Sequence, residues 1–73
     1  MSLVSKHRRI LGDNVRTRRQ QARLTQEKLA EKAELHPVYV SAVERGVKTI
    51  SVDALLRIAK AVKAHPRVFF NGF

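Results

Sequence analysis

A tight corner between two short helical segments constrains the fold of this chain more than any other feature of its sequence. The first segment, 25–33, starts at a threonine whose hydroxyl can accept a free backbone N–H, and its apolar residues recur at helical spacing. Residues 34–36 form the corner, and Pro37 stands where a helix can begin, because its missing N–H is not needed there. The second segment, 37–45, ends before Gly46, which can adopt the left-handed backbone that often follows a helix. The sequence therefore predicts two short helices that meet at a sharp corner.

The rest of the chain is also predicted to be helical. A first helix is expected over 6–22, where one stripe at helical spacing consists of Leu11, Val15, Arg18 and Ala22. Ser51 is expected to cap a fourth helix, and the His65-Pro66 pair opens a final turn or short helix. The one β-favouring triplet, 38–40, follows a proline in a helical pattern. We therefore expect an all-α fold of five helices with no sheet, in which the short second and third helices form a helix-turn-helix.

The length and composition indicate one small domain. Seventy-three residues are expected to form a single unit, 1–73, with the helix-turn-helix at about 25–45 and residues 1–5 as a disordered or tag segment. The chain has no cysteine, which excludes disulfides, iron–sulfur clusters and thiolate zinc sites. So short a chain is only marginally stable alone. Since disulfides and thiolate metal sites are excluded, association with a partner subunit is the remaining source of added stability.

The strong positive charge points to a polyanionic partner. Fifteen Lys and Arg face six Asp and Glu, which gives a formal charge of +9. A field of that sign concentrates polyanions at the surface, and nucleic acid is the commonest of them. Charge that serves only solubility is the alternative interpretation.

The third helix has one face that suits a DNA groove. Val40 and Val43 are expected to point inward. The opposite face carries Val38, Ser41, Ala42 and Arg45. Small side chains allow a helix to lie deep in the major groove, where they can meet thymine methyl groups and base edges. The alternative is a helix that a partner subunit buries on both sides.

These segments resemble a known family. The stretches TQEKLA at 25–30 and SAVERG at 41–46 have the spacing found in the phage Cro and repressor-like (XRE) DNA-binding domains, and the chain is most similar to the controller proteins of restriction–modification systems. The resemblance spans about residues 11–70. It implies a five-helix lambda-repressor-like fold and a sequence-specific regulator of transcription that binds double-stranded DNA. It also implies a homodimer, with the helix 37–45 of each subunit in the major groove.

The resemblance also implies the roles of individual residues. It assigns base contacts to His36, Pro37, Val38, Ser41 and Ala42, and contacts near the sugar–phosphate backbone to Tyr39, Arg45, Lys48 and Thr49. At the start of the second helix it assigns DNA contact to Gln26, next to the capping Thr25. Arg19 and Glu44 match two residues that form an ion pair in the family, and this pair joins the first helix to the helix 37–45, the recognition helix. The family often has glycine where this chain has Arg23 and Glu34, which implies a positive φ at both positions.

The C-terminal end is unusually apolar. A dimer interface is expected from the last two helices, formed by Val62, Val68, Phe69, Phe70 and Phe73. The alternatives are that Phe69 closes the core while the others have no partner, or that the apolar end docks a different protein. In that last case the chain would be the DNA-binding antitoxin or adaptor subunit of a two-protein complex.

Several other functions find no support in the sequence. The three histidines lie on three different elements, so we expect no metal site, and no cofactor or small-molecule ligand is evident. No nucleophile–base pair, paired carboxylates or phosphate loop indicates an enzyme. No apolar stretch approaches the roughly 20 residues that cross a bilayer, and no secretory signal is visible, so we expect a cytoplasmic protein without a membrane partner. The aromatic platform typical of RNA binding is missing.

Overall fold

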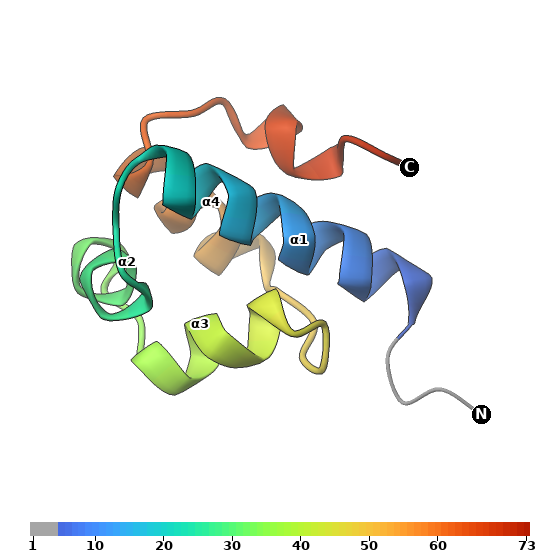
Figure 1. Ribbon diagram of the computed structural model, residues 1–73, viewed down its shortest axis with the longest axis horizontal. Coiled ribbons are helices and arrows are strands. Elements are labelled where there is room, and N and C mark those ends of the chain that lie inside the picture. Colours follow the sequence, from blue (N-terminus) through green and yellow to red (C-terminus); the bar gives the residue numbers. More distant parts are fainter. Residues whose placement is uncertain (1–4) are drawn as a thin grey trace.

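Four α-helices and a short 3₁₀-helix pack around one apolar core in the computed structural model, which describes residues 5–73 (Figure 1). In chain order the elements are α1 (Lys6–Gln21), α2 (Gln26–Ala33), α3 (Pro37–Glu44), α4 (Val52–Ala61) and η1 (Pro66–Phe70). Residues 5–73 contain no strand, as expected. Residues 1–4, from the segment expected to be disordered or a tag, lie outside the described residues. Ser5, from the same segment, caps α1 by accepting the Arg8 backbone N–H.

The prediction of five helices is corrected in one element. The fifth is not an α-helix but the five-residue 3₁₀-helix η1, with a backbone bond from the Val68 N–H to the His65 carbonyl. Such tight helices are used in short pieces. Tertiary contacts hold this one, because the Asn14 side-chain amide donates to the carbonyl oxygens of Phe69 and Asn71 at 2.7 and 2.8 Å.

All five helical elements begin with a side-chain cap. In each, the residue before the helix accepts a backbone N–H from inside the first turn, which satisfies a donor that the helix itself leaves free. The caps are Ser5, Thr25, His36, Ser51 and His65. The expected starts at Thr25, Pro37 and Ser51 are therefore confirmed.

All four α-helices end in the same way. One residue at the C-cap of α2, and directly after the C-cap of the other three, has a positive φ, and two backbone bonds close each last turn in the Schellman pattern. Only α3 uses glycine there, Gly46. The other three positions are Arg23, Glu34 and Lys63, with φ of 60°, 56° and 56°. The positive φ expected at Arg23 and Glu34 is confirmed, and Lys63 adds a third strained end that the sequence did not suggest.

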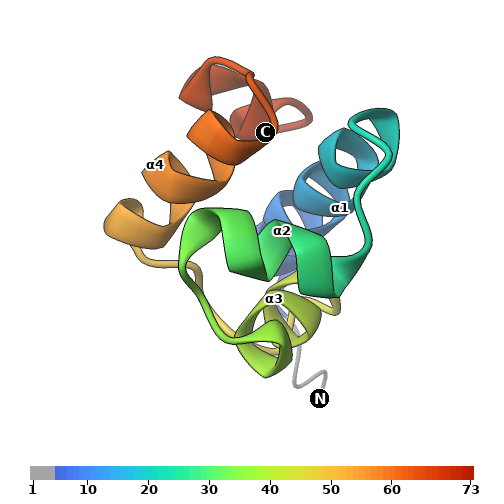
Figure 2. The ribbon, with the colours of Figure 1, turned by 90° about the vertical axis from the view of Figure 1, so that its left-hand side faces the viewer.

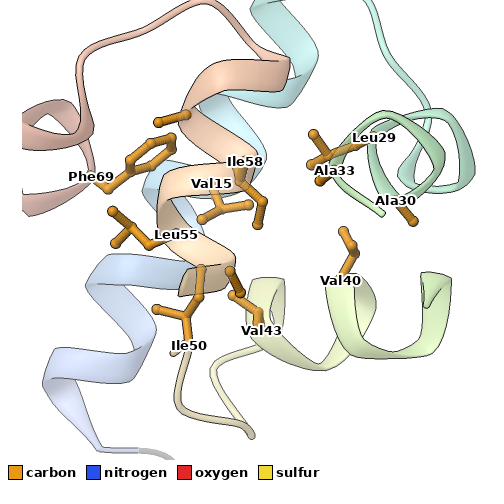
Figure 3. Packing of buried hydrophobic residues seen from close by; sticks show 12 residues of the cluster. Val15, Leu29, Ala30, Ala33, Val40, Val43, Ile50, Leu55, Ile58 and Phe69 are labelled. Carbon is orange, nitrogen blue, oxygen red and sulfur yellow. The ribbon is translucent and has the colours of Figure 1, made fainter. Parts of the chain in front are cut away.

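The core joins α3 to the rest of the chain (Figure 3). Val40 and Val43 point from α3 toward side chains of α1, α2 and α4, among them Val15, Leu29 and Ile58. Helix α1 lies close against the end of α3 at Gly12, where a Cβ atom would lie 2.7 Å from the Glu44 carbonyl oxygen and closer still to that of Val43. The α3 backbone is thus fixed against α1 as well as against α2.

Phe69 belongs to this core, which corrects part of the predicted dimer interface. Its side chain is completely buried, so it cannot contribute to a surface between subunits. Val62 and Val68 are partly buried against the same core. Phe70 and Phe73 remain 51% and 59% exposed. The alternative in which Phe69 closes the core is therefore the one that the structure confirms for this residue.

Candidate nucleic-acid interface

Helix α3 lies along one edge of the molecule, with η1 on the opposite side of α1 and α4 (Figures 1 and 2). Val38 is 67% exposed, and Ser41 and Ala42 are partly exposed, whereas Val40 and Val43 are buried. The predicted division of α3 into an inner and an outer face is confirmed. Across residues 5–73, the small side chains of the outer face stay at least partly exposed.

Five of the residues assigned to DNA contact line one shallow hollow on this edge. They are His36, Val38, Tyr39, Ala42 and Lys48. Arg45 and Thr49, which follow α3, are exposed. The fold thus brings the side chains assigned to bases and those assigned to the backbone of DNA onto one surface.

Tyr39 has a structural contact that the sequence did not reveal. Its hydroxyl oxygen accepts the backbone N–H of Ser51 at 3.0 Å, and the Lys48 ammonium lies 5.8 Å from the centre of its ring. Tyr39 therefore ties α3 to the start of α4. It also holds the cationic end of Lys48 beside the recognition surface.

A buried carboxylate anchors the C-terminal end of α3. Glu44 is 2% exposed and accepts two bonds from the Arg19 guanidinium, Nε to Oε2 at 2.6 Å and Nη2 to Oε1 at 3.0 Å. The third Arg19 nitrogen, Nη1, donates to the Leu24 carbonyl at 2.9 Å. The ion pair expected between these two residues is present, and its two parallel bonds fix the angle between α1 and α3. A buried charge without such partners would cost several kcal/mol, on the order of 3–5.

The Glu44 carboxylate also holds two residues that reach the surface. The Gln26 side-chain amide donates to Oε1 at 3.0 Å, and Arg16 Nε lies 3.5 Å from the same oxygen. Gln26 was assigned to DNA contact, whereas Arg16 was not singled out from the sequence. The amide of Gln26 has a second N–H and an acceptor oxygen left for another partner. Neighbouring Thr25 is exposed, and its hydroxyl accepts the Lys28 N–H.

Residues 5–73 include no group of three or more His, Cys, Asp or Glu that could hold a metal ion. In the same part of the chain, no helix is both long and apolar enough to cross a membrane.

A family model described as helix-turn-helix matches residues 15–69. The chain belongs to this family. It is 38% identical over 61 residues to control protein C.BamHI of Bacillus amyloliquefaciens, an alignment that covers 82% of this chain and 75% of that one. Among helix-turn-helix proteins of known structure, it resembles the restriction–modification controller protein C.AhdI from Aeromonas hydrophila, with 35% identity and a TM-score of 0.84 over 86% of this chain and 96% of that one.

A regulator outside restriction–modification also matches. The clp gene regulator ClgR from Corynebacterium glutamicum has a TM-score of 0.85 and 30% identity, over 90% of this chain and 70% of that one. The predicted relationship to XRE-type proteins and to restriction–modification controller proteins is confirmed. The helix-turn-helix protein described here is a DNA-binding regulator of transcription, as its sequence indicated.

Proposed function

We propose that this protein regulates transcription as a homodimer that binds a two-fold symmetric operator, with α3 of each subunit in the major groove. The exposed outer face of α3 is the observation that supports this mode of binding most directly. A smooth face of small side chains, with cationic residues at its end, can approach base edges closely. The proposal needs no cofactor, small-molecule ligand or catalytic step. A regulator of transcription acts where its DNA is, so the expected cytoplasmic location is part of the same proposal.

The surface residues divide into two roles in this proposal. Base contacts come from His36, Pro37, Val38, Ser41 and Ala42. Contacts to the sugar–phosphate backbone come from Tyr39, Arg45, Lys48 and Thr49, and at the start of α2 from Thr25 and Gln26. The free N–H groups at a helix N-terminus suit a phosphate. The first group would select the sequence, and the second would fix the position of the protein on the duplex.

A titration against DNA at several salt concentrations tests the proposed binding mode. Each phosphate that the protein neutralises releases counterions, so log K should fall with log salt by about 0.9 for each contact. A steep fall with a duplex selected from random oligonucleotides is the expected result. A binding constant that stays flat from low to moderate salt would refute electrostatic binding to the DNA backbone.

An exposed apolar groove supports the homodimer. Val52 and Leu56 on α4 are 76% and 50% exposed, and they line one hollow with Phe70, Leu11 and Pro66. Phe70 was expected in the interface, whereas Val52 and Leu56 were not named. Apolar surface of this kind is unfavourable in water, and a two-fold axis beside it would allow each copy to cover the other. We therefore place the proposed interface at this groove.

Sedimentation velocity of the wild type and of Leu56→Glu tests the dimer. The wild type should sediment as a dimer, and the added charge should shift it to the monomer. Val38→Glu is the matched control, because it places the same charge on an exposed apolar residue of α3 and should leave the dimer intact. A wild-type monomer would instead favour the adaptor or antitoxin alternative, in which a different protein covers the groove.

A further inference from the structure

The cap of the recognition helix fixes the protonation pattern of one side chain at the DNA surface. The backbone N–H of Val38 donates to Nδ1 of His36 at 3.0 Å. A backbone N–H can only donate, so Nδ1 is the acceptor in this bond. A neutral imidazole has one N–H, and in His36 that hydrogen is therefore on Nε2.

The Nε2–H group is free to meet a ligand. His36 is exposed, and the only hydrogen bond of its side chain within residues 5–73 is the one at Nδ1. Its side chain lines the same hollow as Val38 and Ala42. A donor in a fixed orientation thus stands beside two apolar side chains at the N-terminal end of α3.

We propose that His36 is a specificity-determining residue that donates its Nε2–H to guanine in the major groove. This inference rests on the proposed binding of α3 to DNA. Guanine presents two adjacent acceptors in that groove, N7 and O6. Thymine presents one acceptor, O4, adenine places an amino donor beside its single N7 acceptor, and cytosine presents an amino donor. A side chain that can only donate is therefore best satisfied by guanine. The neighbouring Val38 and Ala42 offer methyl groups to thymine, so each half-site should contain guanine next to thymine.

Histidine is not among the preferred helix caps, yet this chain uses it twice. Serine, threonine, aspartate and asparagine are the preferred caps, and serine serves α1 and α4 of this chain. His65 has the same geometry, with Nδ1 accepting the Arg67 backbone N–H at 3.1 Å, and it precedes the same kind of proline. Since η1 lies across the molecule from α3, His65 provides an internal control for the capping role (Figure 1).

Two measurements test the proposal. The first is the ¹⁵N spectrum of the imidazole rings in the free protein, which should show His36 protonated at Nε2 and unprotonated at Nδ1. A His36 ring with the hydrogen on Nδ1 would overturn the inference. This spectrum requires no DNA, so its result is independent of the proposed function.

The second measurement compares selected duplexes in which one guanine at a time is replaced by 7-deazaguanine, which lacks the N7 acceptor. Wild type should lose about 10-fold in affinity at one guanine of each half-site, the effect of about one hydrogen bond. His36→Ser keeps a capping oxygen but is too short to reach the base, so it should lose less than about 2-fold at that guanine. His65→Ser should behave as wild type with every duplex.

The remaining outcomes of the second measurement are also decisive. Equal losses for wild type and His36→Ser at every guanine would overturn the proposed guanine contact. A second outcome would also overturn it. If a neutral methylphosphonate linkage at one position weakened binding by the wild type but not by His36→Ser, His36 would donate to that phosphate and not to guanine. Failure of the wild type to select any duplex would refute the proposed function itself, and with it the guanine contact.

Discussion

The two faces of α3 are built in opposite ways. The inner, C-terminal part holds Glu44, a carboxylate that is almost completely buried and accepts bonds from α1 and α2. The outer face carries Val38, Ser41 and Ala42, whose side chains make no hydrogen bond or ion pair within residues 5–73. The difference separates two tasks. The buried ion pair sets where the helix stands, and the outer face can change its side chains without disturbing that position.

The largest expected effect is a loss of stability when the buried carboxylate of Glu44 is removed. Glu44→Ala leaves the Arg19 guanidinium partly buried without its counter-ion, which should lower the free energy of unfolding by about 3–5 kcal/mol. Urea denaturation followed by circular dichroism measures the change.

Glu31→Ala is the matched control for Glu44→Ala. Glu31 pairs with Lys28 at 3.4 Å, but both side chains are mostly exposed, so its loss should cost less than about 1 kcal/mol. If the two variants were equally stable, the bonds of Glu44 with Arg19 and Gln26 would not be what holds α3 in place.

The outer face should show the reverse behaviour. Val38→Ala and Ser41→Ala should change stability by less than about 0.5 kcal/mol, because neither side chain is fully buried. Each should instead alter the preferred base at one position of the half-site, with discrimination changing by about 1 kcal/mol or more. Selection of duplexes from random oligonucleotides by each variant measures this directly. A loss of stability without a change in preference would contradict the separation of the two tasks.

A third class of residue should affect the affinity for DNA but not the choice of sequence. Arg45 is exposed after the end of α3 and is proposed to contact a phosphate. Arg45→Ala should weaken binding to all sequences alike and reduce the salt slope by about 0.9. Binding titrations with selected and unrelated duplexes at three salt concentrations provide the measurement. A variant that loses affinity for the selected duplex only would place Arg45 among the residues that select the sequence.

The smallest expected effect concerns the strained ends of the helices. Lys63→Gly should stabilise the protein by about 0.5–1 kcal/mol, since glycine adopts a positive φ without steric cost. Lys60→Gly, inside α4, should destabilise it by about 1 kcal/mol, the usual cost of glycine within a helix. Thermal denaturation of the two variants compares them at the same charge. Destabilisation by both would mean that the left-handed turn at Lys63 is not strained.

The starts of the helices could be predicted from the sequence because their causes are local. A capping side chain or a proline acts within one turn, so Thr25, Pro37 and Ser51 marked α2, α3 and α4 correctly. The inner face of α3 followed from periodicity alone. The pairing of Arg19 with Glu44 followed from the resemblance to a family rather than from any local signal.

Other features depend on contacts between distant segments, which a single sequence does not specify. Nothing in the terminal residues 68–73 distinguishes buried Phe69 from exposed Phe70, because the distinction arises from where η1 packs against α1. The bond between Gln26 and Glu44 likewise requires knowledge of how three helices meet. The exposure of Leu56 was within reach, since Leu55, Ile58 and Ala59 recur at helical spacing and leave Leu56 outside their face of α4.

The most direct test of the role of α3 is to map its backbone amide resonances while a selected duplex is added. Residues 36–42 and the start of α2 should show the largest changes in chemical shift, whereas η1, across the molecule, should show little. The largest changes around Val52 and Phe70, with residues 36–42 unaffected, would contradict the account, because DNA would then occupy the apolar groove and not the outer face of α3.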